Sequence, residues 1–469
     1  MKTKQPIDAF ARDLPREVRE SVYVSSKAKY DKRLDSLNQS YTAPDSIRKL
    51  AGQIKQHTLE NLPTYLGSAV EQLEKNGAKV HFAKDGQEAN ETILEIMRGV
   101  GATKLIKSKS MVSEEIHLNP FLEKHGCESI ESDLGEFIVQ LDNDMPSHIV
   151  TPIVHKNRKQ IATTFQKAGI GEDYNDDPQT ITRRARSFLR QKYIEAEVGL
   201  TGGNFVSAES GRIALVTNEG NARFSISANK THIALIGIEK VVPSDKDMAV
   251  LLNLLARSAT GQQLTVYTQF INGPKAAKQP DGPENMHVIF LDNERSNILG
   301  SEFKEILRCI RCGACLNVCP IYRQSSGHAY RAVYPGPVGA VLSPLLAGKK
   351  YPDYADLPKA SSLCGACNEV CPVDIPLPEL LLRHRNKAKQ EGIKKASAGT
   401  PSMAGWSVLC SSPAMWKTSL RAGKAMDYIS LNLIPVPAVQ AWAKERTLPP
   451  FRGGKFRQWF KEHKRNKEA

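Results

Sequence analysis

Three features are missing from the 469-residue sequence: a long apolar run, an export signal and a nucleotide-binding fingerprint. No run reaches the roughly 18 apolar residues that a membrane-spanning helix requires. The segment 428–443 comes closest, but Pro435 and Pro437 interrupt it. The first residues are polar and charged, unlike the apolar core of a secretory signal. We therefore expect a soluble cytoplasmic protein, long enough for two or three domains.

No glycine-rich cradle for the phosphates of a cofactor is recognisable. Gly99-Val-Gly101 lacks the third glycine of the GxGxxG fingerprint, and the GxxxxGK[ST] pattern does not occur. Without a flavin or nicotinamide site, the chain has no visible means of taking hydride from a substrate. We therefore expect a component that passes electrons, and we assign no catalytic residue.

Cysteine is concentrated, with seven of the nine residues in two short runs. The first run has the CxxCxxCxxxCP spacing of bacterial ferredoxins, in which the fourth cysteine ligates the other cluster. Soft, charged thiolates suit iron–sulfur clusters. By reciprocity, cluster 1 is predicted on Cys309, Cys312, Cys315 and Cys371, and cluster 2 on Cys319, Cys364 and Cys367.

Zinc and disulfides are the alternatives to this interpretation. Zinc needs four ligands at each site and gives no reason for the two Cys-Pro endings, Cys319-Pro320 and Cys371-Pro372. Disulfides are not expected in a chain without an export signal. The cysteine pattern therefore favours iron–sulfur clusters.

The second cysteine run lacks one cysteine of the complete motif. A complete motif would place a cysteine at position 361, where the sequence has Ser361. Three outcomes fit: a three-iron cluster, a four-iron cluster with a non-cysteine ligand such as Ser361 or water, or recruitment of Cys410. The sequence does not choose among them.

Positive charge gathers at the carboxyl-terminal end. The net charge is +14, and nearly all of the excess lies between residues 379 and 469. Such a stretch is a solvated face, or a docking surface for an acidic partner or an anionic membrane. No nucleic-acid-binding motif accompanies it, so nucleic acid is not expected, although an oxidation-sensing scaffold on DNA is a third hypothesis. Trp459 and Phe460, an aromatic pair among Lys and Arg, are candidates for a partner contact.

The order of secondary structure predicts an α/β domain between two helical parts. Residues 1–65 are expected to form a helical arm, and 66–295 an α/β domain in which strands and helices alternate around a parallel or mixed sheet. Cys127 is expected as a small buried residue there. The expected strands are 78–82, 104–107, 127–130, 148–150, 205–208, 213–216, 232–236 and 287–291, and the helices 49–65, 87–99, 113–125 with Ser113 as cap, 178–197 and 246–258.

The cysteine runs belong to a third, helical part at 300–392, followed by a basic helical region at 393–469. Between the runs we expect a short helix at 338–346 and a loop at 348–358, and after them a helix at 377–392. Further helices are expected at 403–417 and 417–433, with Trp406 and Trp416 in a core.

Taken together, four segments resemble the LutB family, also called LldF or YkgF. They are the cysteine runs, the linker Tyr334–Leu342, the loop Thr217–Asn221 and the terminal stretch Pro449–Arg457. The resemblance implies an α/β LUD domain, similar to the NagB/RpiA/CoA-transferase group, followed by an α-helical dicluster domain. It also implies two four-iron clusters and a role in oxidising L-lactate to pyruvate. The implied partners are a cysteine-rich LutA-like subunit and a LutC-like LUD subunit.

Our hypothesis is therefore an electron-transfer subunit that relays electrons from a partner through two clusters, towards an acceptor such as the respiratory chain. Such a protein could sit at the inner face of the membrane. The alternative is an acyl- or CoA-transferase-like enzyme with regulatory clusters, in which Glu209 or Glu219 is the nucleophile. These carboxylates lie in polar loops expected at strand ends, where open α/β sheets hold ligands. The missing CoA-binding signature argues against this alternative.

Overall fold

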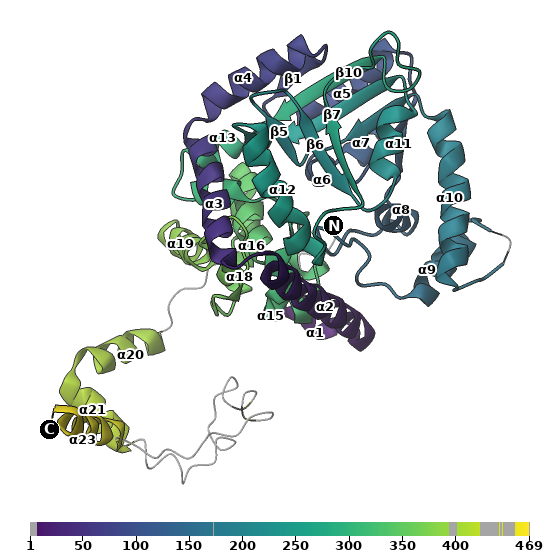
Figure 1. Cartoon of the computed structure of the whole chain (residues 1–469). Coiled ribbons are helices and arrows are strands. Elements are labelled where there is room, and N and C mark those ends of the chain that lie inside the picture. Colours follow the sequence, from purple (N-terminus) through teal and green to yellow (C-terminus); the bar gives the residue numbers. More distant parts are fainter. Residues whose placement is uncertain are drawn as a thin grey trace. The chain divides into compact units, whose positions relative to one another are not determined.

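A computed structural model describes residues 7–171, 173–393, 401–422, 440, 443 and 455–468. The chain divides into two compact units, Met1–Ala396 and Ser397–Ala469. Within the described residues, no helix combines the length and the apolar character that crossing a bilayer demands. The first unit carries the sheets and both cysteine runs (Figure 1).

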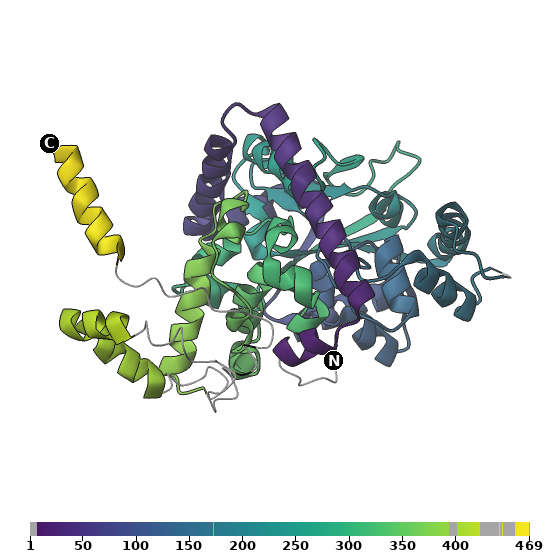
Figure 2. The same cartoon turned by 90° about the horizontal axis from the view of Figure 1, so that it is seen from below.

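The first unit begins with four helices. The sequence predicts a helical arm here, but the expected helix 49–65 is divided and the last helix runs to Lys75, beyond the expected end of the arm. Asn61 leaves helical geometry and Pro63 opens the next helix, because proline suits a first turn but not a helix interior. α2 packs against α12 (Asp245–Thr260) of the α/β domain and against α14 (Ala314–Val318) and α15 (Pro320–Ser325) of the cysteine-rich part, so the arm joins these two parts (Figures 1 and 2). The four helices are α1 Ile7–Asp13, α2 Arg16–Ser40, α3 Pro44–Glu60 and α4 Leu62–Lys75.

A six-stranded, all-parallel sheet forms the centre of the α/β domain, in the order β1-β10-β7-β4-β2-β3. Its middle strand β7 is buried at every position, the continuous apolar pattern of a sheet covered on both faces. Separate apolar clusters pack on the two faces. The strands are β1 Lys79–Ala83, β2 Lys104–Lys107, β3 Glu128–Glu131, β4 Val198–Thr201, β7 Thr231–Gly237 and β10 Asn285–Leu291.

A smaller mixed sheet stands beside it, in the order β8-β5-β6-β9. β5 and β6 pair antiparallel, as do β6 and β9, whereas β5 and β8 are parallel. The bounds are β5 Phe205–Ser207, β6 Ile213–Thr217, β8 Val241–Val242 and β9 Tyr267–Ile271. The sequence did not predict β4, β8 or β9. The predicted helix 178–197 ends at Glu195, and β4 follows almost at once.

Helices cover the sheets. α5, α10 and α12 lie where the sequence predicts helices, whereas α8, α9, α11 and α13 were not predicted. Asp85 and Ser244 cap α5 and α12 by accepting backbone N–H groups of Glu88 and Asp247. Cys127 is buried among apolar residues, as expected. The helices are α5 Gly86–Gly99, α6 Met111–Glu115, α7 Leu118–Lys124, α8 Leu134–Leu141, α9 Arg158–Lys167, α10 Pro178–Glu195, α11 Asn221–Ser227, α12 Asp245–Thr260 and α13 Arg295–Leu299.

Two predictions in this domain were wrong. The expected helix 113–125 is broken at His117, whose φ is 54°, and its cap is Ser110, whose hydroxyl accepts the N–H of Ser113 at 3.3 Å. The expected strand 148–150 is a bend. The His148 ring accepts the N–H of Val150 at 2.9 Å, a hydrogen bond that replaces a partner strand.

The cysteine-rich part is built from short helices around the two runs. The segment 348–358, predicted as a loop, instead contains η4, α17 and η5, because Pro352 and Pro358 each fit the first turn of a helix. The elements are η2 Lys304–Arg308, α14 Ala314–Val318, α15 Pro320–Ser325, η3 His328–Tyr330, α16 Gly336–Leu346, η4 Gly348–Lys350, α17 Tyr351–Tyr354, η5 Leu357–Lys359, α18 Ala366–Glu369 and α19 Leu377–Gln390.

The second unit contains α20 Pro401–Ser411, α21 Pro413–Ala422 and α23 Lys455–Glu468. Trp406 was predicted in a core, but it is 53% exposed and packs in a T-shaped pair with Trp416, at a centroid distance of 5.7 Å. The expected helix 417–433 lies outside the described residues beyond position 422. Trp459 and Phe460 stand on α23 and are 53% and 52% exposed.

Candidate metal centre

The first cysteine run forms a tight turn followed by a single helical turn. Arg311 and Gly313 both have positive φ, 61° and 75°, and α14 begins directly after Gly313. The backbone N–H of Arg311 donates to Cys309 Sγ at 3.4 Å, and that of Tyr322 donates to Cys319 Sγ at 3.5 Å. Such N–H donors stabilise thiolates and help to set cluster potentials. Cys312, Cys315 and Cys319 are buried, and Cys309 is half-buried.

The second run repeats this turn. Leu363 and Gly365 have φ of 55° and 86°, and α18 begins after Gly365. Cys367 and Cys371 are buried, Cys364 is exposed, and the N–H of Ile375 donates to Cys371 Sγ at 3.4 Å. α14 packs against α18, so the two runs face each other.

Burial and neighbouring thiols both raise the pKa values of the buried cysteines. Burial raises the pKa of Cys312 to about 12, and the nearby Cys309 and Cys371 add to the rise. Burial likewise raises the pKa of Cys367 to about 12, with Cys319 and Cys364 as its foremost thiol neighbours. All the cysteines among the described residues are free. Buried thiols without disulfide partners suit a soft metal, whose binding displaces their protons.

Cations from the N-terminal helices hold the second run in place. Arg33 of α2, buried, donates to the carbonyl of Val370 at 2.9 Å. Arg48 of α3 donates to the carbonyl of Cys371 at 2.9 Å and to that of Asn368 at 3.1 Å. Two guanidinium groups therefore stand beside the thiols, where they offset the negative charge that four thiolates and a cluster bring.

The α/β domain contacts the first run through the carboxyl edge of its parallel sheet, where open α/β sheets usually bind ligands. Glu239 and Arg295 follow β7 and β10 at this edge, and each is 1% exposed. Arg295 Nε donates to Glu239 Oε2 at 2.6 Å, and its Nη1 donates to Glu115 at 2.8 Å. Arg311, inside the first run, reaches Glu239 Oε1 at 3.5 Å and lies over the Tyr334 ring.

This buried ion network fixes the first turn to the sheet. Burial alone would raise the pKa of Glu239, but the neighbouring Arg295 and Lys240 lower it, so the carboxylate is charged. Lys55 of α3 donates to the Glu239 carbonyl. Burial lowers the pKa of Lys55 to about 7 and that of Lys240 to about 8, while Glu239 and Cys309 act in the opposite direction. An anionic cluster at Cys309 would reinforce that opposing effect.

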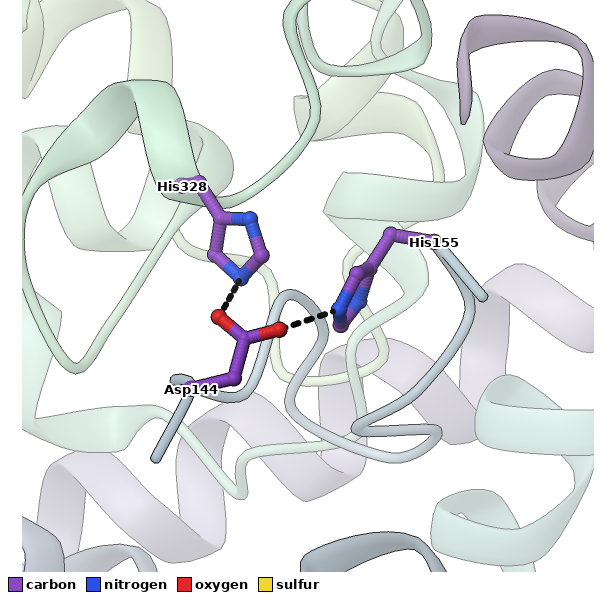
Figure 3. A group of neighbouring side chains, drawn as sticks. All are labelled: Asp144, His155 and His328. Atoms are coloured by element: carbon purple, nitrogen blue, oxygen red, sulfur yellow. Dashed lines mark hydrogen bonds and ion pairs between the residues drawn. The ribbon is translucent and has the colours of Figure 1, made fainter. Parts of the chain in front are cut away.

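A second contact joins the loop 142–156 to the cysteine-rich part. The Asp144 carboxylate lies between two imidazoles: His155 Nε2 donates to its Oδ2 at 2.9 Å, and His328 Nε2 lies 3.7 Å from its Oδ1 (Figure 3). His328 also donates to the carbonyl of Met145 at 2.7 Å. Burial alone would raise the pKa of Asp144, but His155 and His328 hold that pKa well below its usual range. Asp144 therefore acts as an ionised bridge between the two parts.

Beside this bridge lies a cavity of about 730 Å³ with an acidic wall that includes Glu114, Glu131, Glu136 and Asp144. Lys107 Nζ donates to Glu114 at 2.7 Å and also to Glu131. Burial, with Glu131 and Glu114 close by, raises the pKa of Glu136 well above its usual range. The proton that Glu136 retains makes this wall less negative than its carboxyl groups alone would suggest, and the cations Arg331 and Lys350 line the same cavity.

The two candidate nucleophiles have ordinary structural partners. Glu209 Oε2 accepts the N–H of Asp245 at the start of α12, at 3.0 Å. Glu219 Oε2 accepts the N–H of Leu134 at the start of α8, at 3.1 Å. Each carboxylate therefore caps a helix. They also follow strands that run antiparallel, so their loops lie at opposite ends of the strand pair.

Three models of known protein families match successive segments of the chain. A family model described as LUD domain matches residues 66–291, one described as 4Fe-4S dicluster domain matches 305–375, and one described as lactate utilisation protein B, C-terminal matches 381–465. Curated proteins named lactate utilization protein B are 49% identical in Bacillus cytotoxicus and 48% in Bacillus cereus. Each alignment covers 89% of this chain and 88% of the relative. This chain belongs to the lactate utilization protein B family.

Membership confirms the predicted family, the α/β LUD domain followed by a ferredoxin-type dicluster domain, and iron–sulfur clusters as the bound group. A crystal structure of a DUF162 family protein from Deinococcus radiodurans aligns with 49% of this chain and 98% of its own, at 11% identity. Its TM-score of 0.28 is too low to support an argument.

The sequence reveals the seven cysteines of the two runs but not the residues that position them. Arg33, Arg48, Glu239 and Arg295 lie far from the cysteine runs in sequence, and none belongs to a recognisable motif. Only Arg311, inside the first run, was adjacent to a predicted ligand.

Proposed function

We propose that this chain is the iron–sulfur electron-transfer subunit of a complex that oxidises L-lactate to pyruvate. Cluster 1 would be held by Cys309, Cys312, Cys315 and Cys371, and cluster 2 by Cys319, Cys364 and Cys367. When bound, the clusters supply two one-electron carriers. The observation that supports this most is the repeated cysteine turn, with α14 packed against α18, an arrangement in which each run would lend one cysteine to the other's cluster.

Oxidation of L-lactate to pyruvate releases two electrons and two protons, so the substrate site needs an acceptor for both. The sequence has no nucleotide-binding fingerprint for such an acceptor, and Glu209 and Glu219 are occupied at helix starts. The oxidation step is therefore assigned to a partner, and this chain takes the electrons singly. The partners would be a cysteine-rich LutA-like subunit and a LutC-like LUD subunit.

Electrons would enter or leave through cluster 2. Cys364 is exposed, whereas the cluster 1 cysteines are buried or half-buried. Cluster 1 also has more cations around it, among them Arg33, Arg48 and Arg311. Positive charge favours the reduced, more negative cluster, so the arrangement supports a higher potential at cluster 1.

The second unit would provide a docking surface. Phe456, Trp459 and Phe460 lie at helical spacing on α23 and are each more than half exposed, among Lys and Arg residues. An aromatic stripe on a basic helix suits a polar-rimmed protein interface or an anionic membrane surface. Binding of Trp459→Ala and wild type to vesicles with and without anionic lipid, and to the partner subunits, separates the two.

The experiment for the main proposal uses the chain purified anaerobically with its partners. L-Lactate should bleach the visible iron–sulfur absorption of the wild type. Cys309→Ala and Cys371→Ala should each lose cluster 1 iron, whereas the matched control Cys127→Ala, buried in the α/β domain, should keep all iron. Unchanged iron in Cys309→Ala and Cys371→Ala would refute the ligand assignment. Normal growth on lactate after gene deletion, in a strain without a paralogue, would refute the pathway.

The transferase alternative has a separate test. Glu219 is its better candidate, since desolvation and the Asp133 carboxylate raise the pKa of Glu219 to about 7. Glu219→Gln should leave lactate-dependent bleaching unchanged if electron transfer is the function. Loss of an acyl-transfer activity in that variant would favour the enzyme.

A further inference from the structure

The second cysteine turn copies the first at each backbone hydrogen bond that defines it. In the first turn the N–H groups of Leu316 and Asn317 donate to the carbonyl of Gly313, at 3.0 and 3.2 Å. In the second, the N–H groups of Asn368 and Glu369 donate to the carbonyl of Gly365, at 2.8 and 3.2 Å. The next bonds also match, Cys319 to Leu316 and Cys371 to Asn368, each at 3.2 Å.

The match continues upstream, into the position where the second run lacks a cysteine. Arg311 and Leu363 are the equivalent residues with positive φ, at 61° and 55°. The N–H of Arg311 donates to Cys309 Sγ at 3.4 Å, and the N–H of Leu363 donates to Ser361 Oγ at 3.1 Å. Ser361 Oγ therefore occupies, in the second turn, the place of the Cys309 sulfur in the first.

We propose that Ser361 Oγ is the fourth protein ligand of cluster 2 and completes the ligand set of Cys319, Cys364 and Cys367. This inference rests on the function proposed above. As the oxygen–iron bond forms, the hydroxyl proton leaves to solvent and the oxygen binds as an alkoxide. The cluster keeps four irons. An oxygen donor is harder than a thiolate and favours the oxidised iron, so cluster 2 has a lower potential than an all-cysteine ligand set would give it.

The surrounding contacts hold Ser361 in this position. Arg385 of α19 donates from Nε to the carbonyl of Pro358 and from Nη2 to that of Ser361, both at 3.0 Å. The segment before the turn is thereby fixed to a helix of the same unit. Cys410, the other protein donor that the sequence offers, is exposed and belongs to α20 in the other unit.

The test compares Ser361→Ala, Ser361→Cys and Cys410→Ala with wild type and with the control Ser362→Ala, whose side chain is exposed and neighbours the site. Each full-length chain is purified anaerobically, and iron content, oxidised-state EPR and the reduction midpoints are measured. Wild type, Ser362→Ala and Cys410→Ala should hold about eight irons without a three-iron signal. Ser361→Ala should lose about one iron per chain and show that signal.

Ser361→Cys should keep all the iron and raise the reduction midpoint of one cluster only. This variant tests the Ser361 ligand assignment even if Ser361→Ala does not fold. A three-iron signal in wild type, an unchanged Ser361→Ala, or iron loss in Cys410→Ala would overturn the assignment while leaving the electron-transfer proposal intact. A wild-type chain without iron would overturn both.

Discussion

Glu239→Gln should destabilise the first unit strongly, although it changes only one atom. Glu239 and Arg295 are each 1% exposed, so neither charge has water to replace a lost partner. Arg295 would keep Glu115, but Arg311 and Lys240 would lose their nearest carboxylate. Removing one member of a buried ion pair costs about 3–5 kcal/mol.

For a unit of this length, with an unfolding entropy of about 2.1 cal/mol/K per residue, that cost corresponds to a fall in Tm of about 4–6 °C. Differential scanning calorimetry of the full-length protein measures it. The control is Asp31→Asn, which breaks the exposed Lys27–Asp31 pair and should change Tm little. If Glu239→Gln and Asp31→Asn shift Tm equally, the buried network does not anchor the cysteine turn as we describe.

Three further predictions follow from single side chains. Burial raises the pKa of Glu136 in the folded state, so the folded state binds a proton that the unfolded state has already lost. Stability should therefore fall as pH rises from about 4.5 towards the higher folded pKa. Glu136→Gln should flatten this dependence of Tm on pH. Because the folded pKa of Asp144 is depressed, its contribution is complete above about pH 4 and is lost only as pH falls towards that lower folded pKa; Asp144→Asn should therefore lower Tm most at pH 7, and by a shrinking amount as pH falls below about 4. A Cβ added at Gly365 would meet no atom within 4 Å, but the φ of 86° there is unfavourable for alanine, so Gly365→Ala should destabilise the fold by about 1–2 kcal/mol. Gly67→Ala, within α4, should instead stabilise the fold by about 0.5–1 kcal/mol. Urea unfolding of the two variants measures both effects.

The cysteine turns could be predicted because their chemistry is local. Three thiols on one glycine-containing turn, followed by a Cys-Pro step, need only a few adjacent residues to specify them. The parallel sheet was predictable for a similar reason, since β7 and β10 are long apolar strands between amphipathic helices. The broken helix at His117 was not, because a single residue with positive φ leaves no periodic signal.

The supporting network could not be predicted because its members meet only after folding. Glu115, Glu239, Arg295 and Arg311 come from separate segments, and each alone looks like an ordinary surface charge in the sequence. Short or edge strands were missed for a related reason: β9 is mostly half-exposed, so the apolar pattern is weak.

The central claim is that this chain holds two clusters that receive electrons from lactate oxidised elsewhere. The most direct measurement is freeze-quench EPR of the anaerobic native complex after L-lactate is added, with wild type and Cys371→Ala compared. We predict that cluster signals assigned to this chain become reduced in wild type as pyruvate appears, and that Cys371→Ala loses the cluster 1 signal. Pyruvate formation at the wild-type rate while this chain stays iron-free or fully oxidised would contradict the account.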